Sequence, residues 1–329
     1  MKSISLFFIC LLVISCNQTK KPQTMKPKIV IAHRGASGYL PEHTLEAKAM
    51  AHEMNVDFIE QDLVLSKDDV PIVIHDIYLD DVTNVSTKFP NRKRQDNRFY
   101  VIDFTFDELK TLQVTERFNP ETGEQVYKNR FPIWKGNFKL HSLQEEIELI
   151  QGLNASTQKN IGIYPEIKEP AFHAKEGKNL TKIVLKVLAD YGYNTKNDNC
   201  ILQCFDAKEL EKIRKELKSE LFLVQLMEFE DEAKKLGHFA RYADGIGPWY
   251  RQILSEKIDG KFTFTSLVSD AHKLGLQVHP YTFRADALAE FSSFEEMMET
   301  LLIDANVDGA FTDFPNKVIS FLEKQKTNY

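Results

Sequence analysis

The feature that most constrains this 329-residue chain is a repeated alternation of short apolar runs with segments of helical periodicity. The apolar runs lie at 28–32, 58–65, 161–167, 201–205, 221–226, 243–246, 276–281 and 309–312. The helical patterns lie at 44–54, 142–153, 180–191, 207–217, 230–242, 267–274, 294–306 and 315–324. Strands that alternate with helices pair in parallel. Eight such units in about 300 residues predict an α/β fold of the closed (β/α)8 class, a TIM barrel.

One long segment interrupts this rhythm. From about 78 to 140 the chain is rich in Asn, Arg, Asp and Phe, and only 107–112 has a helical pattern. Irregular segments of this length inside a compact domain are usually functional. We therefore expect a long insertion after the second strand, at the mouth of the barrel, where it shapes the substrate pocket. A disordered excursion is the alternative, and the aromatic residues of the segment argue against it.

The first residues have the pattern of an export signal. A positive start at Lys2 precedes an apolar run at 4–14 that is too short to span a bilayer, and polar residues follow Cys16. The run Val13-Ile14-Ser15-Cys16 resembles a bacterial lipobox, in which the cysteine carries lipid. We expect a lipoprotein signal peptide at 1–16, a flexible tether at 17–28 and a single barrel domain at 29–325. An ordinary signal peptide with an incidental cysteine is the alternative.

These features predict an exported protein of the periplasm or cell envelope, held at a membrane by its lipid anchor. The net charge is −6 and the 42 basic residues are dispersed, so nucleic acid is not expected as a partner. Cys200 and Cys204 remain in the folded part. On one strand they would lie about 13 Å apart at about 3.3 Å per residue, and a disulfide needs Cα atoms within about 7 Å. We expect two buried free cysteines.

Carboxylates cluster at the ends of the predicted strands, where TIM barrels carry their functional groups. Glu60 and Asp62 are two residues apart on one strand and therefore project side by side. Glu166 lies near the end of the next parallel strand. Neighbouring carboxylates repel one another unless a proton or a cation lies between them. Glu60, Asp62 and Glu166 therefore predict a hard oxygen site for Ca²⁺, with Mg²⁺ as the alternative.

Two histidines and two cations accompany these acids. His33 follows the first strand and His75 follows an extended run at 70–74. Imidazole titrates near neutral pH, so one histidine can accept a proton from a nucleophile while the other donates one to a leaving alkoxide. Arg34 and Lys168 are predicted to bind phosphate oxygens.

A second set of residues carries a weaker signal. They lie at or just beyond the ends of later strands and are predicted to contact the glycerol or alcohol part of a substrate, with simple packing as an equal alternative: Gln203, Phe205, Trp249 and Tyr281. Beside Pro41, His43 is interpreted as structural support. Four further histidines, at 141, 173, 238 and 272, are expected on the solvated surface.

These residues carry a resemblance to a known family. The runs that resemble motifs of the glycerophosphodiester phosphodiesterase family are His33-Arg34-Gly35-Ala36, Pro41-Glu42-His43-Thr44, Glu60-Gln61-Asp62, His75-Asp76 and Pro165-Glu166-Ile167-Lys168. Later segments at 203–206, 242–247, 279–281 and 311–315 resemble its periplasmic bacterial branch. The similarity covers roughly residues 28 to 324.

The resemblance implies a barrel with an insertion after the second strand, and Ca²⁺ held by the three carboxylates. It implies that His33 and His75 act as general base and general acid and that Arg34 binds the phosphate. The order of the histidines stays open, because a substrate hydroxyl could attack first to give a cyclic intermediate. The implied reaction is hydrolysis of a small glycerophosphodiester, such as glycerophosphocholine or glycerophosphoethanolamine, to sn-glycerol 3-phosphate and an alcohol.

Three other functions compete with this one. An amidohydrolase-type barrel would need several histidine metal ligands, whereas acids outnumber imidazoles here. A phospholipase D-like enzyme on a related barrel would act on intact lipid and expose an apolar rim near the mouth. A surface binding lipoprotein that had lost the chemistry would carry a broken set of catalytic groups, and this set is complete.

Overall fold

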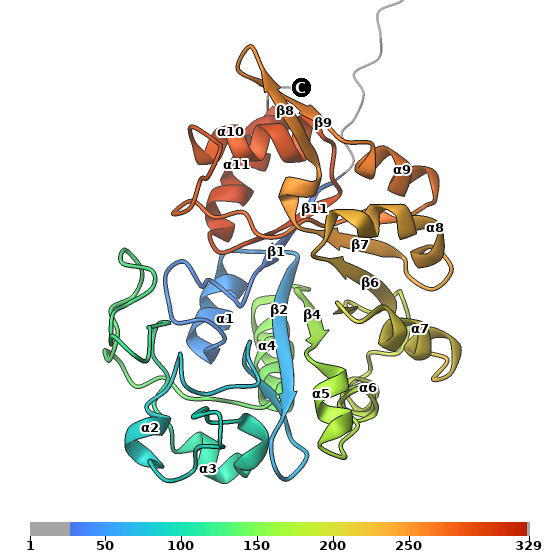
Figure 1. Cartoon of the computed structure of the whole chain (residues 1–329). Coiled ribbons are helices and arrows are strands. Elements are labelled where there is room, and N and C mark those ends of the chain that lie inside the picture. The colour runs from blue at the N-terminus through green and yellow to red at the C-terminus, as the bar shows by residue number, and fades with distance from the viewer. Residues whose placement is uncertain (1–26, 328–329) are drawn as a thin grey trace, which may run out of the picture.

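The computed structural model describes residues 27–327, and at its centre a sheet of parallel strands curls into a nearly closed barrel (Figure 1). The barrel strands are β1 (Ile29–Ala32), β2 (Phe58–Leu65), β4 (Gly162–Ile167), β5 (Ile201–Cys204), β6 (Phe222–Met227), β7 (Gly245–Pro248), β10 (Gln277–Val278) and β11 (Gly309–Thr312). Along the sheet their order is β10-β7-β6-β5-β4-β2-β1-β11. The Asp308 N–H donates to the Val278 carbonyl at 2.9 Å and so joins the two ends of the sheet. The prediction of a TIM barrel is confirmed.

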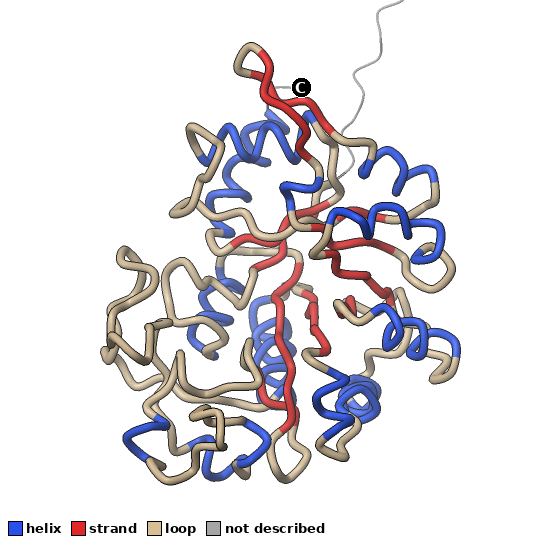
Figure 2. Tube along the Cα trace, viewed as in Figure 1, coloured by secondary structure: helices blue, strands red, loops and turns tan. Residues whose placement is uncertain are grey.

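Helices surround the strands (Figure 2). They are α1 (Leu45–Glu53), α4 (Leu143–Thr157), α5 (Pro170–Lys175), α6 (Leu180–Asp190), α7 (Ala207–Lys215), α8 (Leu236–Phe239), α9 (Leu267–Lys273), α10 (Phe294–Met298) and α11 (Pro315–Thr327). Local sequence fixes where several of them begin. Ser142 and Glu145 form a reciprocal capping box at the start of α4, an arrangement in which the cap residue contributes about 1 kcal/mol. The buried face of α4, which includes Ile147 and Ile150, then packs in the main core.

The register of the strands decides which residues reach the mouth of the barrel. Successive side chains point alternately into the barrel and out toward the helices. One buried cluster fills the interior: Ile31, Tyr164, Ile201, Val224 and Phe311. Two positions beyond members of this cluster, on the same strand faces, lie His33, Glu166 and Asp313. The alternation that fills the interior with apolar side chains therefore also delivers polar groups to the carboxyl ends of the strands.

The insertion at 78–140 is ordered and packs as a lobe beside β2 and the short strand β3 (Pro71–Val73), which pairs antiparallel with β2. Most of its backbone is loop (Figure 2), and its helices are the short α2 (Val85–Lys88), η1 (Val101–Asp103) and α3 (Phe106–Lys110). The lobe has its own core, which includes Leu79, Phe99, Phe104, Leu109 and Phe138. The helix expected at 107–112 begins earlier because Thr105 caps it in a box with Glu108. The disordered alternative is therefore wrong.

A hairpin that the strand pattern did not predict projects from the barrel after β7 (Figure 1). Its strands, β8 (Leu254–Ile258) and β9 (Lys261–Phe264), are antiparallel. The turn residues Asp259 and Gly260 both have positive φ, 49° and 78°. Asp-Gly favours this conformation in tight hairpins. The dipeptide was therefore the one sequence feature that could have predicted this hairpin.

Three other elements differ from expectation. The segment 230–242 is a 3₁₀ turn, η2 (Glu230–Lys235), followed by the short α8, because η2 buries no side chain that would hold a longer helix. The segment 294–306 is α10 followed by a π-helical turn, η4 (Glu299–Asp304). The strand expected at 276–281 is regular only over β10, because Pro280 has no N–H with which to extend the ladder, and beyond it Tyr281 forms an isolated parallel bridge with Trp249.

The predicted signal peptide at 1–16, the lipidation site Cys16 and all but the end of the tether at 17–28 lie outside the described residues. Among the helices of residues 27–327, none combines the length and the apolar character that crossing a bilayer requires. Cys200 and Cys204 are both buried and free, as predicted.

Candidate active site

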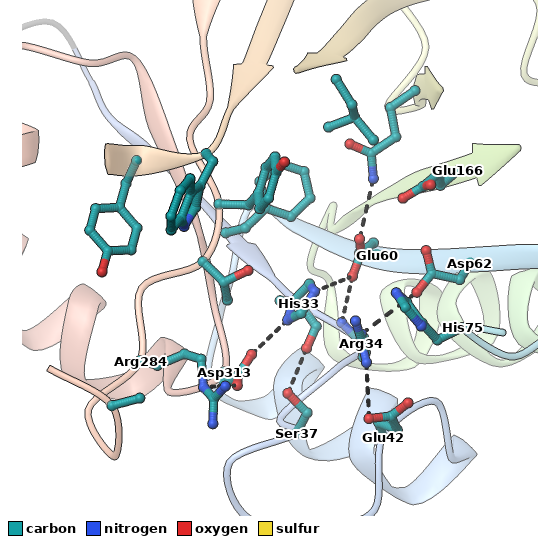
Figure 3. Close-up of a pocket in the computed structure, with 18 of the residues that line it drawn as sticks. His33, Arg34, Ser37, Glu42, Glu60, Asp62, His75, Glu166, Arg284 and Asp313 are labelled. Carbon is teal, nitrogen blue, oxygen red and sulfur yellow. Dashed lines mark hydrogen bonds and ion pairs between the residues drawn. The ribbon is translucent and has the colours of Figure 1, made fainter. Parts of the chain in front are cut away.

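A cavity of about 440 Å³ lies at the end of the barrel where the parallel strands finish (Figure 3). Every site residue predicted within the barrel lines it: His33, Arg34, Glu60, Asp62, His75, Glu166, Lys168, Gln203, Phe205, Trp249 and Tyr281. Ser37, Glu42, Arg284 and Asp313 line it as well, and the insertion contributes Tyr127 and Arg130. The structure therefore gathers the predicted residues in one place, at the face where TIM barrels carry function.

Glu60 and Asp62 of β2 and Glu166 of β4 form a buried carboxylate cluster. Each residue offers one oxygen, and these oxygens lie within 4.8 Å of one another. Asp62 and Glu166 are direct partners in the β2–β4 register, so strand pairing itself sets them side by side. Burial raises the pKa of Glu60 and raises that of Glu166 well above its usual range. A bound cation would stabilise the ionised form of both.

The cluster fits a hard divalent cation in two further respects. Asp62 Oδ1 is buried and has no hydrogen-bond partner. Burial opposes ionisation of Asp62, but the Lys168 ammonium and a hydrogen bond from His43 hold its pKa well below the usual range. The cluster therefore offers a charged, unsatisfied oxygen beside two more carboxylates, and such a donor set suits Ca²⁺ or Mg²⁺.

His33 lies between the cluster and an aspartate (Figure 3). Its Nδ1 is 2.6 Å from Asp313 Oδ1, and its Nε2 is 3.9 Å from Glu60 Oε2. Asp313 follows β11, and its second carboxylate oxygen lies 3.2 Å from Arg284 Nε. Hydrogen bonding at Nδ1 fixes the ring and turns Nε2 toward the carboxylates.

His75 reaches the cavity from the other side of the cluster (Figure 3). Its Nδ1 lies 2.8 Å from Asp76 Oδ1, the carboxylate of the next residue. Burial, aided by the nearby Arg34 and Lys168 cations, lowers the pKa of His75 to about 4 against the opposing effect of Asp76. Each histidine thus has an aspartate on Nδ1.

Arg34 and Lys168 supply positive charge beside the carboxylates. Arg34 adopts a left-handed conformation, φ 58°, and its backbone N–H donates to Glu60 Oε2 at 2.7 Å. Its Nη1 lies 3.0 Å from Glu42 Oε2, while its buried Nε has no hydrogen-bond partner. Lys168 Nζ lies 2.9 Å from Glu166 Oε1. Both cations can therefore contact an anion that enters the cavity.

A buried polar network supports the cluster from behind. His43 Nε2 lies 2.7 Å from Asp62 Oδ2, and His43 Nδ1 lies 3.2 Å from Lys48 Nζ. Lys48 is fully buried, and its ammonium also contacts the Glu60 carbonyl and, at 3.1 Å, Glu146 Oε1. A buried ammonium needs such partners. The motif signal singled out His43, but Lys48 and Glu146 looked like ordinary helix residues in the sequence.

The expectation that His141 and His173 lie on the surface is wrong. They are 2% and 1% exposed. His141 Nε2 lies 2.7 Å from Glu146 Oε2, and His173 Nε2 accepts a hydrogen bond from the Leu65 N–H at 3.0 Å. Both rings satisfy buried polar groups near β2, a role that only the folded structure reveals. His238 and His272 are half-buried.

The opposite wall of the cavity is largely aromatic. Phe205 and Tyr281 contact edge to face with ring centroids 5.9 Å apart, and the Tyr281 hydroxyl donates to the Met227 carbonyl at 2.9 Å. Phe205 and Trp249 remain 38% and 41% exposed. Gln203 is buried and donates to Glu60 Oε1 at 3.3 Å. Gln203 therefore contacts the charged half, whereas the three aromatic side chains form an apolar rim.

Comparison with known proteins agrees with this geometry. The sequence profile described as the glycerophosphoryl diester phosphodiesterase family matches residues 33–317. A glycerophosphodiester phosphodiesterase of Haemophilus influenzae is 45% identical over 92% of this chain and 91% of its own length. One from Treponema pallidum is 35% identical over 90% of this chain and 92% of its own.

Solved structures share the fold at low identity. A phosphodiesterase from Oleispira antarctica, in complex with the product sn-glycerol-3-phosphate, has a TM-score of 0.63 at 21% identity and covers 91% of this chain and 97% of its own. A glycerophosphodiester phosphodiesterase from Thermotoga maritima has a TM-score of 0.58 at 19% identity and covers 90% of this chain and 98% of its own. The profile match over most of the chain, together with the Haemophilus influenzae and Treponema pallidum relatives, shows that the chain belongs to the glycerophosphoryl diester phosphodiesterase family.

Proposed function

We propose that this protein hydrolyses glycerophosphodiesters, such as glycerophosphocholine and glycerophosphoethanolamine, to sn-glycerol 3-phosphate and the free alcohol. One observation carries the proposal: His33 and His75 flank a buried carboxylate cluster in a single cavity that also holds two cations. Family membership supports it, as do relatives of nearly full length that are named for this activity.

We infer that Glu60, Asp62 and Glu166 hold Ca²⁺. Three carboxylates in one place favour Ca²⁺ over Mg²⁺, because Mg²⁺ usually takes one or two carboxylates and keeps several waters. When bound, a divalent cation neutralises charge on the phosphoryl oxygens. Arg34 and Lys168 add to this neutralisation from the protein side, and Arg34 Nε, which has no hydrogen-bond partner and lies 3.7 Å from Asp62 Oδ2, can donate to a phosphate oxygen.

The two histidines then divide the proton transfers. One accepts the proton of the attacking hydroxyl, either of water or of the substrate glycerol, as the new P–O bond forms. The other donates a proton to the alcohol oxygen as its bond to phosphorus breaks. If the substrate hydroxyl attacks first, water opens the resulting cyclic phosphate by the same two transfers in reverse. Asp313 and Asp76 hold the rings through Nδ1 and leave Nε2 to exchange protons.

The charged half of the cavity is assigned to the phosphate and the metal. The aromatic wall is therefore where the glycerol and the alcohol of the substrate would lie. We infer that Phe205, Trp249 and Tyr281 contact the glycerol or the departing alcohol, and that Gln203 contacts the glycerol beside Glu60. The exposed faces of Phe205 and Trp249 would also suit an acyl chain, the rim expected of a phospholipase D-like enzyme. Intact lysolipid therefore belongs in the substrate panel.

The decisive assay couples release of glycerol 3-phosphate from glycerophosphocholine to an enzymatic readout, and it follows release of choline, the product that both substrates share, to compare glycerophosphocholine with lysophosphatidylcholine. We expect turnover of glycerophosphocholine, loss of activity with a chelator and recovery with Ca²⁺ rather than Zn²⁺. Faster turnover of lysophosphatidylcholine would favour the lipid-directed alternative. Indifference to chelation would remove the metal from the mechanism.

We further propose that the protein is an exported lipoprotein of the periplasm or cell envelope, anchored through Cys16. The lipobox-like run before Cys16 supports this, as does the resemblance of the segments at 203–206 and 242–247 to the periplasmic branch. Metabolic labelling with radioactive palmitate should mark the wild type and not Cys16→Ser. Equal labelling of both would contradict the anchor.

A further inference from the structure

The two histidine–aspartate pairs share a feature that the reaction alone does not explain. Asp313 contacts His33 through Oδ1, and its Oδ2 lies 2.5 Å from Arg130 Nη2. Asp76 contacts His75 through Oδ1, and its Oδ2 lies 2.8 Å from Arg117 Nη1. Both arginines belong to the 78–140 insertion. Each histidine is thus held by an aspartate whose far oxygen faces an arginine of the same lobe.

Arg130 is itself firmly held. Its side chain is 4% exposed, its Nε lies 2.8 Å from Asp286 Oδ2, and its Nη1 donates to the Ser37 carbonyl at 3.2 Å. Its guanidinium also lies over the Tyr127 ring, 4.1 Å from the centroid. These contacts join the insertion to the loops after β1 and β10. Arg284 adds a second cation to Asp313.

Arg117 occupies the matching position on the other side. Besides Asp76, it lies 2.7 Å from Glu42 Oε1 through Nη2. The other oxygen of Glu42 lies 3.0 Å from Arg34 Nη1. Arg117 therefore links the aspartate behind His75 to the carboxylate that orients Arg34.

We infer that the insertion is a positioning device that aligns both proton-transfer histidines, and that Arg117 and Arg130 are its positioning residues. The inference rests on the proposed function and goes beyond it, because neither arginine needs to contact substrate. A bidentate or forked arginine fixes the plane of a carboxylate. A fixed carboxylate keeps the proton on Nδ1 and holds Nε2 in line, and small misplacement of such a group is costly in rate.

The test replaces each arginine by Ala and by Lys. Arg94→Ala is the matched control, since Arg94 lies in the same lobe and pairs with Asp103 and Glu176 away from the cavity. We expect kcat on glycerophosphocholine to fall about 100-fold in the Ala variants, and less with Lys, which keeps the charge but not the fork. KM should stay within about threefold for Arg130 variants and rise for Arg117 variants, because Glu42 also holds Arg34.

A second substrate separates positioning from general damage. The 4-nitrophenyl ester of sn-glycerol 3-phosphate releases a phenolate that needs no proton, so the general acid becomes dispensable. One arginine variant should recover nearly wild-type kcat on this ester, and the other should stay impaired. The variant that recovers identifies the histidine that acts as the acid.

Several results would overturn the inference. They are an unchanged kcat in both arginine variants, a loss no larger than that of Arg94→Ala, or impairment of both variants by the same factor on the two esters. Melting temperature and calorimetric Ca²⁺ affinity, measured on every variant, identify unfolding; if an Ala variant unfolds, the Lys variant carries the test. Absence of wild-type turnover on either ester would instead refute the proposed function.

Discussion

The barrel and the 78–140 insertion contribute to the same cavity by different means. The barrel places its groups through strand register, so that Asp62 and Glu166 meet because β2 and β4 pair. The insertion, mostly loop, places Arg117 and Arg130 through ion pairs and a core of its own. The comparison teaches that the rigid sheet supplies the reacting groups, while a separately packed lobe supplies the groups that align them.

The largest effect should come from the histidines that the barrel end supplies. We expect His33→Ala and His75→Ala each to lower kcat at least about 100-fold, because general acid or base catalysis is lost. Steady-state kinetics on glycerophosphocholine measures this, and circular dichroism with calorimetric Ca²⁺ binding controls for folding. A variant that keeps more than a tenth of wild-type activity would place its histidine outside the reaction.

The next effect concerns the metal oxygens. Glu166→Gln should lower Ca²⁺ affinity by more than about 100-fold, measured by titration calorimetry, since a charged ligand is lost. The melting temperature of the metal-free variant should equal or exceed that of the wild type, because the buried like charge is also lost. Glu169→Gln, at an exposed neighbouring position, is the control. Unchanged Ca²⁺ binding by Glu166→Gln would exclude the cluster as the metal site.

The barrel and the carboxylates that it carries could be predicted from the sequence. Alternation of strand and helix patterns predicted the fold class, and the two-residue period of a strand placed Glu60 and Asp62 on one face. The same period extends from Phe311 to Asp313, so the partner of His33 carried a signal that the sequence interpretation left unassigned.

The ion pairs that the insertion makes with the barrel could not be predicted from the sequence. Arg130 meets Asp313 across 183 residues of chain, and Arg117 meets Glu42 across 75. No periodicity links such positions, because ion pairs between loops depend on how the lobe packs on the barrel. The same reason explains the failure at His141, whose partner Glu146 is hidden only once α4 covers β2.

A smaller effect on activity should follow from weakening the core of the lobe. Phe99 is fully buried there, and Phe99→Ala should destabilise its surroundings by about 3–5 kcal/mol. We expect hydrogen exchange to become faster in 78–140 while the barrel strands stay protected. We also expect kcat to fall, because Arg117 and Arg130 would no longer be held in position. Phe239→Ala, in the main core, should instead quicken exchange in the barrel. Equal loss of protection in both regions after Phe99→Ala would show that they unfold as one unit.

The smallest effect on activity concerns Glu116, beside Arg117 in the lobe. Glu116 is 1% exposed, and its Oε2 has no hydrogen-bond partner. Burial, aided by the charge of Glu42, raises its pKa to about 8. Because the pKa is higher in the folded state, Glu116 favours folding at acid pH, and this contribution is lost as the pH rises from the unfolded pKa of about 4.5 through about 8.

Glu116→Gln keeps the shape without the proton equilibrium. Urea unfolding should show a difference from the wild type of under about 1 kcal/mol at pH 5, and a variant that is more stable by about 4–5 kcal/mol at pH 9, the linkage value for a pKa that rises from about 4.5 to about 8. Activity at neutral pH should not change, because Glu116 contacts neither histidine–aspartate pair. A stability difference that is independent of pH would mean that the lobe lets water reach this carboxyl group. In that case the lobe would be a looser support for Arg117 than the barrel is for His33.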